Sequence, residues 1–93
     1  GGFYENIPRA LPGGYSVKVD KASLKIPSIF RLIEEKGNIP ERDMFNTFNM
    51  GVGMSVTVAD EDKEKAIEIL KANGEDAYII GSVIKSDEGV IIE

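Results

Sequence analysis

One alternating run divides the chain into two parts: Val52-Gly53-Met54-Ser55-Val56-Thr57-Val58-Ala59. Successive side chains of a β-strand point to opposite faces, so one face would carry the apolar residues and the other only small residues. We therefore predict a strand over residues 52–59. Small residues on the second face indicate that this face is also covered, or that another group approaches the backbone closely.

Helices are predicted on both sides of this run. Asp60 suits the N-cap of a helix over residues 61–73, and Gly74 suits its end. Apolar spacing and terminal Pro or Gly predict three more helices, over residues 3–11, 27–37 and 40–48. Pro8 lacks an N–H group, so the first of these is either kinked or regular only from about Ile7 onward.

Three further strands are predicted, over residues 15–19, 77–84 and 90–92. The order along the chain is then helix, strand, two helices, strand, helix, strand, strand. This order indicates an α+β fold, a two-layer α/β sandwich with helices on one face of a mixed or antiparallel sheet. No repeat or linker interrupts it, so we predict that residues 1–93 form a single domain.

The composition excludes several classes of function. Eleven Lys and Arg against 16 Asp and Glu give a net charge of −5, which argues against a nucleic-acid partner. The absence of Cys and His excludes the usual zinc sites, a cysteine nucleophile and a histidine base. Apolar stretches fall far short of the roughly 20 residues of a membrane span. We expect no membrane association and a cytoplasmic protein.

The first candidate site lies at the start of the sequence. Gly1 and Gly2 lead into a helix that carries Asn6 and Arg9. A glycine turn before a helix offers backbone N–H groups to an anion, and Asn6 and Arg9 are spaced to share one helix face. The alternative is a disordered end followed by an ordinary solvated arginine.

The second candidate site lies where a predicted helix meets the alternating run. Asn46, Thr47, Asn49 and Gly51 place two amides, a hydroxyl and a glycine together, and ligands commonly bind at such junctions. The alternative is that Asn and Thr only cap and turn the chain. The acidic run at residues 60–62 suits a helix start, so we predict no metal site there.

Five segments, taken in order, carry a family resemblance: residues 1–9, 29–38, 47–54, 72–81 and 90–93. Together they resemble the phosphoribosylformylglycinamidine cyclo-ligase family, also called AIR synthetase, over essentially the whole chain. The resemblance is to the later part of the AIR synthase-related C-terminal domain. It implies a C-terminal fragment of a larger enzyme whose missing N-terminal portion would be a partner.

The resemblance also implies a reaction. The family uses ATP, with Mg²⁺, to activate the formyl oxygen of formylglycinamidine ribonucleotide, and a substrate nitrogen then closes the imidazole ring of aminoimidazole ribonucleotide. On this basis Gly1, Gly2, Asn6 and Arg9 would hold a phosphate group of a nucleotide substrate. Four residues would line the cleft between domains: Asn46, Thr47, Asn49 and Gly51. We expect the fragment alone to be inactive and to bind no cofactor.

Two other interpretations remain open at the level of sequence. A ferredoxin-like module that binds a small regulatory molecule, or a structural interaction domain, would also fit the order of elements. Neither requires the polar junction at residues 46–53. A partial sheet would leave strand edges uncovered, so we expect a homo-oligomer formed through residues 15–19 or 90–92.

Overall fold

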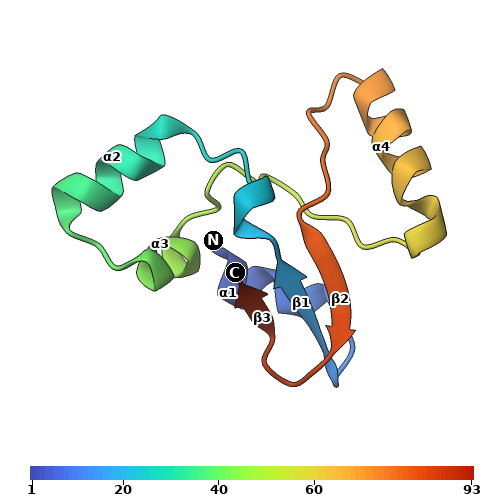
Figure 1. Cartoon of the computed structure of the whole chain (residues 1–93), viewed down its shortest axis with the longest axis horizontal. Helices are drawn as coiled ribbons and strands as arrows, with labels where there is room; N and C mark the ends of the chain where they lie inside the picture. The colour runs from blue at the N-terminus through green and yellow to red at the C-terminus, as the bar shows by residue number, and fades with distance from the viewer.

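The computed structural model describes residues 1–93 and contains a three-stranded sheet in the order β2-β1-β3 (Figure 1). β1 (Tyr15–Val19) pairs antiparallel with β2 (Gly81–Lys85) and parallel with β3 (Val90–Ile92). An α+β fold with a mixed sheet is therefore confirmed. The expectation that residues 15–19 form a free edge is wrong, because β1 is the central strand and both of its edges are occupied.

A small core lies between the sheet and two short helices, α1 (Phe3–Asn6) and α3 (Glu41–Thr47). The rings of Phe3 and Phe45 meet edge to face, with their centroids 5.2 Å apart. This geometry is a favoured one for aromatic pairs. The buried apolar residues of the core are Phe3, Val17, Val19, Leu24, Met44, Phe45, Met50 and Val90.

Pro8 divides the first predicted helix. The α-helical turn ends at Asn6, and residues Ile7–Ala10 continue as a 3₁₀ turn. An α-helix would need an N–H at Pro8, which proline lacks, so the chain adopts the tighter turn instead. The alternative in which regular helix begins near Ile7 is therefore wrong.

The next two helices agree with prediction. α2 (Ser28–Gly37) follows Pro27, and α3 follows Pro40. The residue that adopts the left-handed conformation after α2 is Asn38, with φ 52°, rather than a glycine. Asn is the residue that most often replaces Gly at this position.

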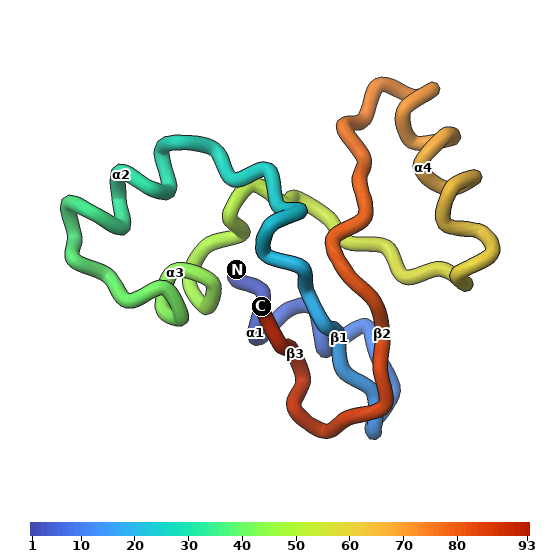
Figure 2. Tube along the Cα trace, in the orientation of Figure 1, coloured from blue at the N-terminus to red at the C-terminus, as the bar shows by residue number.

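The predicted strand over residues 52–59 is wrong. These residues have no regular secondary structure, and they lead through a 3₁₀ turn (Asp60–Asp62) into α4 (Lys63–Ala72). Figure 1 shows α4 standing away from the sheet, and Figure 2 shows the chain returning from it to β2. A strand needs a partner, and residues 52–59 pair with none of the three strands of the sheet. β2 is also shorter than predicted, since residues 77–80 pair with no strand.

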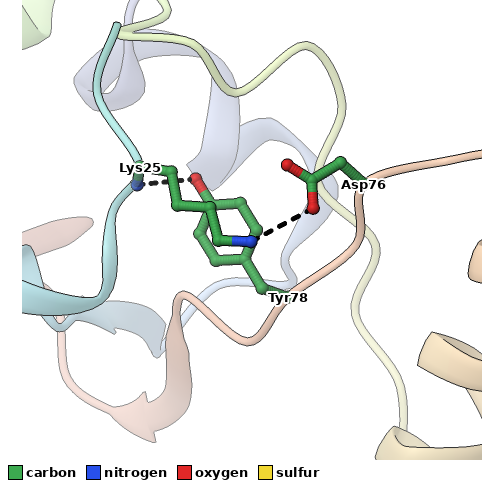
Figure 3. Close-up of polar contacts among 3 residues, drawn as sticks. All are labelled: Lys25, Asp76 and Tyr78. Atoms are coloured by element: carbon green, nitrogen blue, oxygen red, sulfur yellow. Dashed lines mark hydrogen bonds and ion pairs between the residues drawn. The ribbon is translucent and has the colours of Figure 1, made fainter.

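A cluster of three side chains fixes the returning segment to the loop before α2 (Figure 3). The backbone N–H of Lys25 donates to Tyr78 Oη at 3.1 Å, and Lys25 Nζ lies 3.1 Å from Asp76 Oδ1. Lys25 Nζ also lies 4.9 Å from the centroid of the Tyr78 ring. The ion pair is exposed and contributes at most about 1 kcal/mol, so the cluster positions this segment more than it stabilises it.

Candidate functional site

The two candidate segments lie against each other in the structure. Gly2 is so close to the end of α3 that a Cβ atom there would collide with the carbonyl groups of Phe45 and Asn46. Glycine is therefore required by the close approach of the two backbones. The Phe3–Phe45 ring contact continues the same interface into the core. The packing of α1 on α3 thus joins segments that are more than 40 residues apart.

A pocket of about 310 Å³ opens at this junction. It combines members of both candidate sites, because Gly1, Gly2 and Asn6 line it together with Asn49. The alternating run supplies most of the remaining wall. The full lining comprises Gly1, Gly2, Phe3, Asn6, Ile7, Asn49, Val52, Gly53, Met54 and Ser55.

Asn6 holds the glycine segment in place. Its side-chain Nδ2 donates to the carbonyl oxygen of Gly2 at 2.9 Å, and its backbone N–H donates to the same oxygen at 3.3 Å. Its Oδ1 makes no hydrogen bond within the chain and is available to accept one. Asn6 therefore shapes the pocket and also offers it an acceptor.

Asn49 shapes the opposite wall. Its Oδ1 accepts a hydrogen bond from the N–H of Gly51 at 2.8 Å, the local turn that Asn side chains favour. Met50 and Gly51 follow with φ of 52° and 94°. A Cβ atom on Gly51 would lie 2.5 Å from Pro27 Cδ. Gly51 is thus needed for the turn, while the Nδ2 group of Asn49 makes no hydrogen bond within the chain.

The other four predicted site residues do not line this pocket. Arg9 lies exposed on the 3₁₀ turn, and Asn46 and Thr47 are exposed at the end of α3. Gly51 lies beyond the pocket wall. The structure therefore brings together three of the four residues of the first candidate site and one of the four of the second.

Sequence reasoning missed Ser55, which brings a hydroxyl group into the pocket. The sequence feature that could have indicated Ser55 was the second face of the alternating run, where only small residues occur. Gly53 and Ser55 belong to that face, and both line the pocket. The expectation that this face is covered, or that another group approaches it closely, is wrong, because Gly53, Ser55 and Thr57 are exposed and a Cβ atom on Gly53 would meet nothing within 4 Å.

The pocket is polar and carries no charged side chain. It is lined by residues that carry the amides of Asn6 and Asn49 and the hydroxyl of Ser55. Neutral donors of this kind bind and orient anionic oxygens. No side chain here has the pKa of a general base, so the pocket is suited to binding rather than to proton transfer.

Other regions of the molecule are weaker candidates for a ligand-binding site. A hollow of about 460 Å³ lies beside α2 and α3, where Lys21 pairs with Glu41 and the lining also includes Arg31, Glu34 and Glu93. No predicted site residue lines it. No group of three Asp or Glu side chains is placed to hold a metal ion. None of the helices has the length and hydrophobicity of a membrane-spanning segment.

Comparison with known proteins identifies the family. The family described as "AIR synthase related protein, C-terminal domain" matches residues 1–93. The chain belongs to this family. Among its relatives are proteins named phosphoribosylformylglycinamidine cyclo-ligase from Shouchella clausii, 54% identical over 99% of this chain, and from Caldicellulosiruptor bescii, 47% identical over all of it. A Staphylococcus aureus protein of the same name is 45% identical over 98%.

This AIR synthase-related chain is much shorter than those relatives. It covers 26% of the S. clausii protein and 27% of the C. bescii and S. aureus proteins. The chain thus spans about a quarter of the length of the curated relatives it matches. The resemblance seen in five sequence segments is confirmed, and it concerns one part of a cyclo-ligase.

Proposed function

We propose that this chain forms one wall of the substrate cleft in a phosphoribosylformylglycinamidine cyclo-ligase of purine biosynthesis. The parent enzyme would close the imidazole ring of formylglycinamidine ribonucleotide with ATP and would act in the cytoplasm. The observation that carries the proposal is the pocket in which Gly1, Gly2 and Asn6 meet Asn49, in a chain of the AIR synthase-related family.

The role of the pocket in this proposal is to hold a phosphate group of the nucleotide substrate. Asn49 Nδ2 and Ser55 Oγ would donate hydrogen bonds to phosphate oxygens. Such contacts fix the position of the substrate and leave the reacting groups to other parts of the enzyme. Arg9 does not line the pocket, so this proposal does not rely on it.

ATP and Mg²⁺ would be bound elsewhere in the parent enzyme. Mg²⁺ prefers carboxylate oxygens and phosphates, and the pocket contains no acidic side chain. Its residues therefore do not fit the metal. The chain also has no glycine-rich phosphate loop of the P-loop kind. In the proposed enzyme this chain binds and orients, while the remaining portion activates the formyl oxygen.

The test is a chimera in which this chain replaces the matching quarter of the C. bescii cyclo-ligase. We expect the purified chimera to convert formylglycinamidine ribonucleotide with release of ADP. Asn49→Ala should lower kcat/KM about tenfold or more, because a hydrogen bond to a charged phosphate contributes about 1.5–3 kcal/mol. Asn49→Asp keeps the acceptor for the Gly51 amide but adds negative charge, so it should lower kcat/KM further.

Thr57→Ala is the control, since Thr57 is exposed, does not line the pocket and is not one of the predicted cleft residues. It should leave kcat/KM unchanged. A folded chimera without activity would contradict the proposed reaction. An active chimera in which Asn49→Asp matches the unsubstituted protein would instead contradict the assignment of the pocket.

A further inference from the structure

Tyr78 holds a short segment whose own backbone has few hydrogen bonds. The segment comprises residues 25–27 and joins the 3₁₀ turn Lys21–Ser23 to α2. The backbone of Lys25 and Ile26 makes one hydrogen bond within the chain, from the Lys25 N–H to Tyr78 Oη at 3.1 Å. The next residue is Pro27, which has no N–H to donate. The hydroxyl of Tyr78 therefore determines where this segment lies.

The turn of the candidate pocket packs against the same segment. A Cβ atom on Gly51 would lie 2.5 Å from Pro27 Cδ and 3.3 Å from the carbonyl oxygen of Lys25, so the two backbones are in close contact. The N–H of Gly51 donates to Asn49 Oδ1 at 2.8 Å, and Asn49 lines the pocket. A displacement of residues 25–27 would therefore reach Asn49 through one packed contact and one hydrogen bond.

The ring of Tyr78 is anchored while its hydroxyl reaches out to the segment (Figure 3). The side chain is half-buried and packs against the hydrophobic core. Lys25 Nζ lies 4.9 Å from the ring centroid and 3.1 Å from Asp76 Oδ1. The side chains of Lys25 and Asp76 are 60% and 73% exposed, so this ion pair is weakened by solvent. The contact between the hydroxyl and the Lys25 amide is thus the one that fixes the position of the segment.

We infer that Tyr78 is a positioning residue for the candidate pocket: it holds residues 25–27 against Gly51 and so fixes Asn49 at the pocket wall. Tyr78 does not itself line the pocket, so it affects a bound substrate only through this turn. The inference deepens the proposed function and rests on it for the identity of the ligand. It also makes the geometry of the pocket depend on the segment that returns from α4 (Figure 2).

Tyr78→Phe in the chimera tests this role. The substitution removes the hydroxyl and keeps the ring, so the packing of the ring on the core is retained. We expect KM for formylglycinamidine ribonucleotide to rise about two- to tenfold, the effect of losing one neutral hydrogen bond. The value of kcat should change less than about twofold, because the pocket holds the substrate equally in the ground state and the transition state.

Asp76→Asn is the matched control. It removes the charge that pairs with Lys25 and leaves the hydroxyl of Tyr78 in place, so both KM and kcat should be unchanged. A merely structural role of Tyr78 would instead lower kcat, through a smaller folded fraction, and leave KM unchanged. That result in Tyr78→Phe would overturn the inference.

A double-mutant cycle tests whether the effect passes through Asn49. If it does, Tyr78→Phe should have no further effect on KM in a chimera that already carries Asn49→Ala. The same increase in KM in both backgrounds would overturn the inference, since Tyr78 would then act independently of Asn49.

A spectroscopic measurement follows the turn without any substrate. Met50-Gly51 is the only Met-Gly pair in this chain, so isotope labels on Met carbonyls and Gly nitrogens select a single NMR signal, that of the Gly51 amide. We expect Tyr78→Phe to move this signal and Asp76→Asn to leave it in place, because only the first substitution releases residues 25–27. An unmoved signal in Tyr78→Phe would overturn the inference.

Together the two measurements separate this inference from the proposed function. A folded chimera without activity, combined with a Gly51 signal that Tyr78→Phe moves, refutes the function and keeps the positioning of the turn. An active chimera in which Asn49→Asp lowers kcat/KM but Tyr78→Phe leaves KM unchanged refutes the positioning role and keeps the function.

Discussion

Replacing Gly2 by Ala tests the contact that builds the pocket. Gly2 has φ −98° and ψ 178°, an extended conformation that any residue adopts, so alanine introduces no backbone strain. The added Cβ would instead collide with the carbonyl groups of Phe45 and Asn46. These are backbone atoms, which no change of side-chain rotamer can move aside. α1 would have to shift away from α3 and weaken the Phe3–Phe45 contact.

The expected cost follows from the size of this disturbance. Overpacking of a well-packed site costs about 1–3 kcal/mol, and the rigid obstruction places Gly2→Ala at about 2–3 kcal/mol. Phe3 and Phe45 are 3% and 2% exposed, so the shift would disturb the centre of the core. For a domain of this size each kcal/mol lowers Tm by about 4–8 °C, which predicts a decrease of about 10–20 °C.

Urea unfolding followed by circular dichroism measures the effect as a change in the midpoint at constant slope. Gly13→Ala is the matched control, because a Cβ at Gly13 meets nothing within 4 Å. Its free energy of unfolding should stay within about 0.5 kcal/mol of that of the unsubstituted protein. If Gly2→Ala and Gly13→Ala unfold at the same urea concentration, α1 does not pack against α3, and the pocket as described does not exist.

Two further predictions concern stability and charge. Ser16 is fully buried, and its Oγ donates to the Ser86 carbonyl and accepts from the Gly89 N–H, each at 2.9 Å. Ser16→Ala should therefore lower the free energy of unfolding, measured in urea, by about 1–3 kcal/mol. An effect below about 0.5 kcal/mol would contradict these contacts. A hydrogen bond and charge attraction from Asp60 raise the pKa of Lys63 above its usual 10.5. The stability that this exposed pair contributes is therefore present below pH 10.5 and is lost as the pH rises through the folded-state pKa. Titration of Lys63 by NMR should show the pKa falling toward 10.5 in Asp60→Asn, and an unchanged value would refute the pairing.

The helices could be predicted because their signals are local. Proline before α2 and α3 and the spacing of apolar residues depend only on neighbours in the sequence. The bounds of α4 were also close, at Lys63–Ala72 against the predicted 61–73. The strand over residues 52–59 failed for the opposite reason. Alternation reports which side chains share a face, but it does not report whether another strand is available to pair.

The site was predicted in two halves that sequence alone could not join. Glycines and amides marked both segments, since these residue types serve turns and ligands in the same way. Their meeting depends on the packing of Phe3 against Phe45, a contact between distant parts of the chain. The same packing left Arg9 outside the pocket, although its spacing from Asn6 suits a shared helix face. Helical spacing fails there because Pro8 interrupts the helix between them.

The failed strand and the exposed surface have one explanation. Only ten of the 93 residues are buried. Several of the most exposed large apolar side chains, including Met54, Val56 and Ile69, belong to the arm around α4. The unpaired alternating run and the exposed apolar side chains of α4 therefore have the same cause: neither segment has an apolar surface to pack against. α4 has its main contacts with the 3₁₀ turn before it and not with the three-stranded sheet, so side chains that the sequence pattern places on an apolar face remain exposed.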